Sequence, residues 1–409
     1  MKPSGQILII LFLSHFCAGL RIKKYQVSNK VSSFDVIQTS ASKSAGHCSL
    51  LCRTQMGCEG TKYENAECST LKNIKLDGED SVWVDVDQKT IKKTKLLITT
   101  GMISEDDQTT EIIDLKDPNN HCTTVPFPKP LQNTFNGLIG TDVPLICGGN
   151  GGPGALSTQC FTLWNKEYIE TSFSLPKAYG ALGHNLGVVL NGSLFKVGGG
   201  GGGPSAYAVS LNGIKQMKSA PRNLLHHCTV KVDEKSLMVL GGLDGKDRNK
   251  KTWILNIEEN TWKPGLPLID SRVSCACANF QLGSRNILVV SGGGTDSVEF
   301  LDLEANTGWV KGYSLSFKTI HSFGILQIFI SGKSLPFQVS MHAMVTSPDG
   351  QGVLNIGGHG DRKELLLLEC PTNDLNDCDW KILKQELKSP RKLMAAMLIP
   401  DSLADDLCN

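Results

Sequence analysis

The chain has 409 residues, of which 20% are charged, and its formal net charge is +1 at pH 7. A charge so close to balance argues against broad electrostatic attraction to nucleic acid, so we expect no nucleic-acid partner. The length exceeds that of a usual single domain and predicts two units or one large repeat architecture.

The N-terminal segment reads "MKPSGQILIILFLSHFCAGL", with one lysine ahead of an apolar stretch from Ile7 to Leu13 and small residues at its end. This order is typical of a secretory signal peptide over residues 1–19; the alternative is a buried N-terminal strand. No second stretch reaches the roughly 18 apolar residues of a membrane-spanning helix. We therefore expect a secreted, extracellular protein without membrane insertion.

Of the fourteen cysteines, Cys17 lies in the predicted signal peptide and thirteen remain. In an oxidising compartment most of these should pair. The odd number leaves at least one thiol free or bonded to another chain, so the oligomeric state stays open.

Four cysteines cluster in "HCSLLCRTQMGCEGTKYENAECSTL", where the spacing of Cys48 and Cys52 places both sulfurs on one face of a short helix. Residues 60–73 read as a strand pair. Four cysteines allow three pairings, and we favour Cys48 with Cys68 and Cys52 with Cys58. A zinc site is the alternative, which the absence of paired C-x-x-C spacings disfavours.

The order C-x3-C, Cys58, Tyr63 and then Cys68-x-x-Leu71 resembles the PAN/apple family. The resemblance implies a small disulfide-rich α+β module over residues 20–90. Family members bind proteins or carbohydrates, but the resemblance assigns that role to no particular residue here.

Short apolar runs downstream end in glycine at intervals of about fifty residues. A second extended run and a tryptophan follow in the later units, and nothing between them has helical periodicity. Four strands per period is the signature of propeller blades. The first glycines of these units are Gly101, Gly148, Gly198, Gly241, Gly292 and Gly357.

The diglycine, the downstream tryptophan and the "P-R" step resemble the kelch repeat, most closely around Gly241, Gly242 and Trp262. The resemblance covers residues 91 to 400 and implies an all-β fold, a six-bladed kelch-like β-propeller over residues 91–409. "TKLLITTGM" reads as the second strand of the first blade and "SPRKLMAAMLIP" as its first. We therefore expect residues 390–400 to close the ring and remove exposed sheet edges.

The six glycines from Gly198 to Gly203 satisfy a phosphate-binding G-x-G-x-x-G pattern only trivially. That fingerprint needs a helix N-terminus after the loop, whereas "PSAYAVSLNG" reads as a strand. We expect Gly198 and Gly199 to end a strand and Gly200 to Gly203 to lengthen the next connection.

Basic residues recur before the first strand of successive blades, in "FPKP", "LPKA", "APRN", "DSRV" and "SPRK". Converging at one mouth of the channel, they would attract acidic peptides, sulfated glycans or other anions. The alternative is that each side chain bonds neighbouring carbonyls and locks the blades. The kelch resemblance supports binding, since kelch propellers that bind peptides use this mouth. The residues are Lys129, Lys177, Arg222, Arg272 and Arg391.

Histidines recur on the innermost strands as His184, His227 and His342. Imidazoles in a ring could hold copper or zinc, whereas kelch repeats often place histidine there for packing. A galactose-oxidase-like copper enzyme would need two tyrosines and two histidines at one site, and no such motif is recognisable. We expect no metal, no cofactor and no enzymatic activity.

The remaining cysteines look structural: Cys147 with Cys160, and Cys370 with Cys378, can each cross a hairpin. Cys228, Cys275 and Cys277 fall on innermost strands, where a free thiol behaves as a small hydrophobe.

Asn191, Gly192 and Ser193 form a glycosylation sequon that is also a hairpin signal. The extra length at residues 316–337 is a binding loop, a loop under the ring or a gene-model artefact.

Together these patterns predict a secreted, non-catalytic binding protein. It would recognise an extracellular protein or glycan, an anionic one among the options, through the propeller mouth, the PAN-like module or both. The alternatives are a secreted copper oxidase and a propeller that serves as a spacer while the N-terminal module binds.

Overall fold

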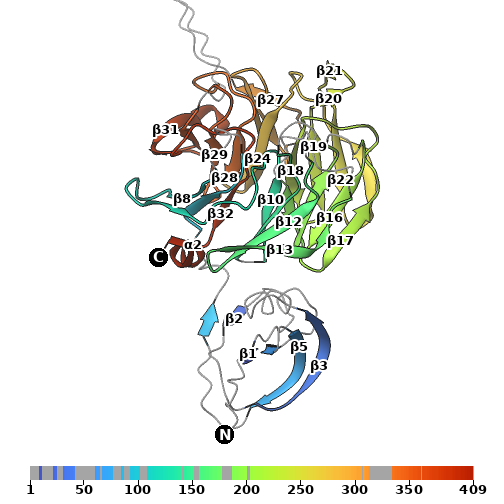
Figure 1. The fold of residues 1–409 in the computed structure, drawn as a ribbon. Coiled ribbons are helices and arrows are strands. Elements are labelled where there is room, and N and C mark those ends of the chain that lie inside the picture. The colour runs from blue at the N-terminus through green and yellow to red at the C-terminus, as the bar shows by residue number, and fades with distance from the viewer. Residues whose placement is uncertain are drawn as a thin grey trace, which may run out of the picture.

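The computed structural model describes residues 93–408 except 102–107, 141, 152–155, 177–186, 200–202, 306, 313–333 and 361 (Figure 1). Before residue 93 it describes the backbone of six strands. These are β1 (Ile9–Leu11), β2 (Ile22–Lys24), β3 (Val31–Ala41), β4 (Gly60–Glu64), β5 (Glu67–Leu76) and β6 (Val84–Val86).

The N-terminal strands form one sheet in the order β1-β4-β5-β3 and a separate pair, β2 with β6. The β4–β5 hairpin lies where the sequence predicts a strand pair. Ile9–Leu11 pairs with β4, the arrangement of the alternative to a signal peptide, so cleavage after Gly19 stays a prediction. Cys48, Cys52, Cys58 and the side chain of Cys68 lie outside the described residues, and their pairing stays a prediction too.

Six four-stranded antiparallel sheets make up the rest of the chain, which confirms the predicted all-β, six-bladed ring (Figure 1). Blade 1 is β32 (Ala396–Ile399), β7 (Lys95–Ile98), β8 (Thr110–Asp114) and β9 (His121–Thr124). Blade 2 is β10 (Phe135–Ile139), β11 (Val143–Cys147), β12 (Gln159–Trp164) and β13 (Glu167–Ser174). Blade 3 is β14 (Val188–Leu190), β15 (Ser193–Val197), β16 (Ala206–Ser210) and β17 (Gly213–Met217).

Blade 4 is β18 (Cys228–Asp233), β19 (Ser236–Leu240), β22 (Thr252–Asn256) and β23 (Thr261–Pro264), with a small hairpin of β20 (Leu243–Asp244) and β21 (Asp247–Arg248). Blade 5 is β24 (Cys275–Leu282), β25 (Arg285–Gly292), β26 (Val298–Asp302) and β27 (Val310–Gly312). Blade 6 is β28 (Ala343–Thr346), β29 (Val353–Ile356), β30 (Glu364–Glu369) and β31 (Asp379–Glu386).

Every pair of neighbouring blades shares one apolar core. The core between blades 1 and 2, for example, joins Leu97 of β7 to Ile146 of β11. Successive side chains of a strand point to opposite faces of the sheet. Each blade therefore buries one face against the preceding blade and the other face against the following blade. This double burial explains why second strands such as β7, β11 and β19 are almost continuously apolar.

The ring closes where the sequence predicts, since β32 pairs with β7 and Ala396 lies opposite Ile98. The chain then adds an unpredicted helix, α2 (Asp401–Cys408), whose Leu403 and Leu407 are buried. A disulfide between Cys122 of β9 and Cys408 staples this helix to the outer strand of blade 1. The closure is therefore both hydrogen-bonded and covalent.

The diglycines adopt one backbone conformation in blades 2 to 6. The first glycine has φ between 55° and 68° and the second between 88° and 124°. At Gly242 a Cβ would lie 2.5 Å from the carbonyl oxygen of Leu225. Both the positive φ and the close approach require glycine. Gly198 and Gly199 share this conformation, so the six-glycine run begins as an ordinary strand end.

Candidate binding face of the propeller

In each blade, the connection from the second to the third strand and the loop that leads into the first strand lie at the same end of the sheet. We name this end of the ring the connection face and the loop before each first strand the lead-in loop. The other end carries the tight hairpins. The segment at residues 316–337 belongs to the lead-in loop of blade 6 and is described only from residue 334 onward.

The lead-in loops of the blades are chained together by backbone hydrogen bonds. Each described loop holds one residue with φ between 52° and 61°: Asn133, His226, Ser274, Met341 or Leu393. At four described junctions, the amide of this left-handed residue donates to the carbonyl of the left-handed residue in the preceding blade, at 2.8 to 3.0 Å. These left-handed residues give a register that relates one blade to the next.

This register corrects the predicted set of equivalent cations. Arg272 and Arg391 lie two residues before the left-handed position, whereas Lys129 and Arg222 lie four residues before it. The "P-K" and "P-R" steps look alike in sequence but fall at different points of the loops. The four described basic residues are therefore not at equivalent positions, and Lys177 lies outside the described residues.

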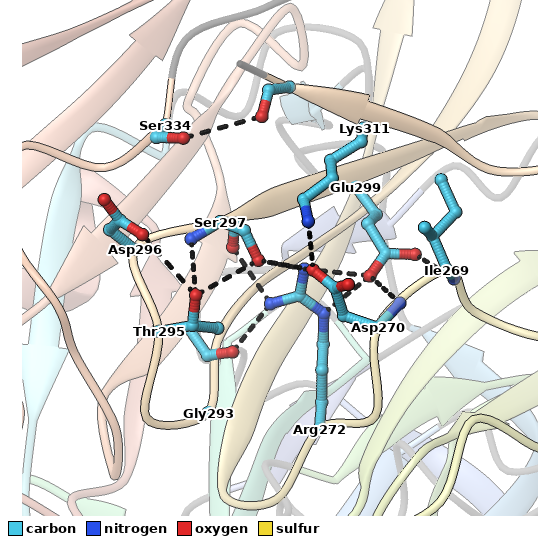
Figure 2. A network of polar contacts seen from close by, with 12 residues as sticks. Ile269, Asp270, Arg272, Gly293, Thr295, Asp296, Ser297, Glu299, Lys311 and Ser334 are labelled. Carbon is cyan, nitrogen blue, oxygen red and sulfur yellow. Dashed lines mark hydrogen bonds and ion pairs between the residues drawn. The ribbon is translucent and has the colours of Figure 1, made fainter. Parts of the chain in front are cut away.

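Arg272 is fully buried and holds blade 5 together (Figure 2). Its Nε donates to Glu299 Oε1 at 3.0 Å, and Nη1 donates to the carbonyls of Gly292 and Ser297 at 2.7 and 2.9 Å. Glu299 also accepts from the amide of Ile269 at 2.6 Å. The guanidinium thus joins the lead-in loop of the blade to its second and third strands.

Arg391 makes the corresponding lock in blade 1. Its Nη2 lies 2.9 Å from Glu111 Oε1 and donates to the carbonyl of Thr109 at 3.0 Å. The other oxygen of Glu111 accepts from the amide of Lys388 at 2.8 Å, as Glu299 accepts from Ile269. Both side chains of the pair are fully buried.

Blades 2 and 6 carry an apolar pair at the same two positions. In blade 2 Leu131 and Phe161 share a core, and in blade 6 Val339 and Leu366 do so. Where the lead-in loop has arginine, the third strand has glutamate; where it has leucine or valine, its partner is apolar. This substitution pattern marks the arginines as structural locks. The burial and ion pairs of Arg272 and Arg391 favour the locking alternative over contact with a ligand.

Around the Arg272 lock, a second layer of polar groups reaches the surface (Figure 2). Lys311 pairs with Asp270 at 2.7 Å, and Ser297 Oγ donates to the same carboxylate at 3.1 Å. Burial alone would raise the pKa of Asp270, but the bonds from Lys311 and Ser297 and the charge of Arg272 lower it. This carboxyl is therefore ionised at neutral pH and lies 3.9 Å from the guanidinium of Arg272.

The histidines of the innermost strands are packed between blades. His227 and His342 are buried, and desolvation lowers the pKa of each to about 3. His342 Nε2 lies 3.0 Å from Ser291 Oγ. Within the described part of the chain, no three His, Cys, Asp or Glu side chains are placed to hold a metal. His184 lies outside the described residues.

The structure joins Cys147 to Cys160 and Cys370 to Cys378, the two pairs expected from the sequence. It also joins Cys228 to Cys277, two cysteines that we expected at buried positions without assigning a disulfide. Asn191 and Gly192, with φ of 47° and 70°, form the tip of the β14–β15 hairpin.

Three exposed cations of the connection face lie on the β20–β21 hairpin of blade 4, which Figure 1 labels, and directly after it. Lys246, Arg248 and Lys250 are exposed. Arg248 Nη1 donates to the carbonyl of Gly293 at 3.2 Å, and Lys250 donates to the carbonyl of Ile269. The sequence carries a signal for this element in "LDGKDRNKK", because Asp-Gly between short extended pieces is typical of a hairpin.

No family model matches the chain, and no curated protein matches it. Among solved structures, that of YjhT superimposes with a TM-score of 0.50 and 12% sequence identity, covering 72% of this chain and 97% of that one. The chain has a β-propeller fold. At this identity the likeness concerns the fold alone. Among the described helices, none has the length and apolar character to cross a membrane.

Proposed function

We propose that the protein is a secreted, non-catalytic binding protein whose connection face recognises an anionic extracellular partner. The observation that carries this proposal is the β20–β21 hairpin. It presents Lys246, Arg248 and Lys250 to solvent, and the side chains of Arg248 and Lys250 bond to the backbone carbonyls of Gly293 and Ile269. The arginines of blades 1 and 5 are buried in ion pairs, whereas these three cations are exposed to a ligand.

The ring suits such a role because it is held rigid. Apolar cores join neighbouring blades, and hydrogen bonds join the lead-in loops at the four described junctions. A preorganised surface loses little conformational entropy when a ligand binds, which leaves more of the interaction energy for affinity. Lys129, which contacts Gln159, and the half-buried Arg222 lie in lead-in loops of the same face.

A copper oxidase is less well supported by the described tyrosines. Tyr168 bonds to Thr110 Oγ1 at 2.7 Å, and burial raises its pKa. Tyr207 is buried in the core between blades 2 and 3. The Tyr168 hydroxyl bonds to a threonine and Tyr207 packs in an apolar core, so the binding role is the better proposal.

The proposal is tested with the triple variant Lys246→Glu, Arg248→Glu, Lys250→Glu. A matched control, Lys116→Glu, Lys166→Glu, Lys215→Glu, makes the same charge change at exposed positions on outer strands and hairpin tips. Binding of the full secreted chain to immobilised acidic peptides and sulfated glycans is measured at low and at physiological salt. We expect at least a tenfold loss of affinity and a weaker salt dependence in the first variant only.

Equal binding by the two variants and the unchanged chain would remove the hairpin from the binding site. Retained binding would then favour the N-terminal module as the binding unit and the propeller as a spacer. Binding lost equally in both variants would show only a dependence on net charge and would count against a localised site.

A further inference from the structure

The core between blades 4 and 5 holds three cysteines. Cys228 of β18 is bonded to Cys277 of β24, with their Cα atoms 6.0 Å apart. Cys275, two residues earlier on β24, is buried and is the free cysteine of the described residues. A buried thiol therefore lies beside a disulfide that ties two blades together.

The two cysteines of β24 face the same way. Side chains two residues apart in a strand share a face, and both sulfurs belong to the core that includes Cys228 and Leu240 of blade 4. The amide of Ser274 donates to the carbonyl of His226 at 2.8 Å, which holds the starts of the two strands together. The amide of Cys228 also donates toward the Cys275 sulfur. Cys228 is thus within reach of either cysteine of β24.

We propose that Cys228, Cys275 and Cys277 form a thiol–disulfide exchange site, at which the clamp between blades 4 and 5 moves from Cys277 to Cys275. The Cys275 thiolate attacks the Cys228 sulfur, a Cys228–Cys275 bond forms, and the Cys228–Cys277 bond breaks. Cys277 leaves as a thiolate and takes up the proton that Cys275 released. One disulfide and one thiol are present before and after, so no oxidant or reductant is required.

The environment keeps the exchange slow in the closed ring. Burial raises the pKa of Cys275 to about 11; among nearby charges, Arg272 opposes this shift and Glu299 reinforces it. The thiolate is the nucleophile, so little reactive sulfur exists at neutral pH while the core stays dry. Separation of blades 4 and 5, which admits water, or alkaline pH would start the exchange.

The arrangement has two consequences for the chain. The clamp can re-form when either cysteine of β24 is lost, because the other takes its place. The thiol of Cys275 is also shielded from a second molecule, so this cysteine does not join two chains while the ring is closed.

The test is disulfide mapping of the full secreted chain by mass spectrometry. Free thiols are alkylated in denaturant at acid pH, disulfides are then reduced and labelled with a second reagent, and fragment ions distinguish Cys275 from Cys277. In Cys277→Ala we expect a Cys228–Cys275 disulfide, and in the matched control Cys275→Ala we expect Cys228–Cys277. Alkylation of both Cys228 and Cys275 in folded Cys277→Ala would overturn the proposal.

A second measurement covers the case in which Cys277→Ala fails to fold. The unchanged chain is held at about pH 10, where a useful fraction of Cys275 is thiolate, and is then quenched with acid and mapped. We expect a mixture of Cys228–Cys277 and Cys228–Cys275, with Cys147–Cys160 unchanged as the internal control. Only Cys228–Cys277 after prolonged incubation would reject the exchange.

Discussion

Arg391, just before the last strand of the chain, forms a fully buried ion pair at 2.9 Å with Glu111, on the third strand of blade 1. In addition to the hydrogen bonds between β32 and β7, this ion pair links the C-terminal segment to the beginning of the propeller. Blade 5 repeats the arrangement with Arg272 and Glu299. In blade 2 the same two positions hold Leu131 and Phe161, so the fold itself offers an apolar replacement.

Removing one partner of this pair should destabilise the protein more than removing both. Glu111→Phe or Arg391→Leu alone leaves a buried, uncompensated charge, which costs about 3–5 kcal/mol of unfolding free energy. The double variant copies the pair of blade 2 and should recover most of that loss. Denaturant midpoints of the four proteins in a double-mutant cycle measure the coupling. Additive losses, without recovery, would show that the pair is not a unit.

The C-terminal staple should contribute more to stability than the short disulfide of blade 6. The Cys122–Cys408 bond spans 286 residues and the Cys370–Cys378 bond spans 8. In the chain-entropy account a longer loop restricts the unfolded chain more, which predicts a difference of about 3 kcal/mol. We expect Cys122→Ala with Cys408→Ala to lower the denaturant midpoint more than Cys370→Ala with Cys378→Ala. The opposite order would show that packing of α2, not the covalent bond, closes the ring.

The architecture was predictable because its main signals are local. Glycine ends a strand in each blade. The sequences of β7 and β32, at the two ends of the propeller, each resemble part of an incomplete blade. The equivalence of the arginines was not predictable, because the left-handed residue that sets the register is a different amino acid in each loop, from Asn133 to Leu393. The helix α2 was not predicted, because eight residues show little helical periodicity. The disulfide of Cys408 was not predicted either, because its partner, Cys122, lies in a strand that is distant in the sequence.

Acid should destabilise the ring through its buried histidines. His342 has a pKa of about 3 when folded and about 6.5 when unfolded, so between these values the unfolded chain binds more protons. Its contribution is present above about pH 6.5 and is lost as the pH falls toward 3, by about 1.4 kcal/mol per unit. His342→Gln should flatten the fall in the urea midpoint between pH 7 and pH 4.5, as measured by fluorescence. The exposed His359→Gln serves as the control and should behave as the unchanged chain does.

A glycan on Asn191 would test secretion and surface exposure together. Asn191 is exposed at the tip of the β14–β15 hairpin, and the chain has no other Asn-x-Ser/Thr sequon. When the full chain is expressed in mammalian cells, we expect it in the medium with a mass that falls on glycosidase treatment. Asn191→Gln and Ser193→Ala should remove that shift, and Ser193→Thr should keep it. A secreted chain of unmodified mass would contradict glycosylation without contradicting secretion.

Two glycines separate the cost of backbone strain from the cost of a steric clash. Gly245 has φ of 66°, and a Cβ at this position would point into open space. Gly242 has φ of 90°, and a Cβ there would lie 2.5 Å from the carbonyl oxygen of Leu225 and 2.9 Å from His227 Cβ. Gly245→Ala should cost about 1 kcal/mol of unfolding free energy through the positive φ alone. Gly242→Ala must also displace the lead-in loop of blade 4, so it should lower the denaturant midpoint several times more. Equal losses would mean that this loop yields easily, and the diglycine would then be explained by backbone conformation without close packing.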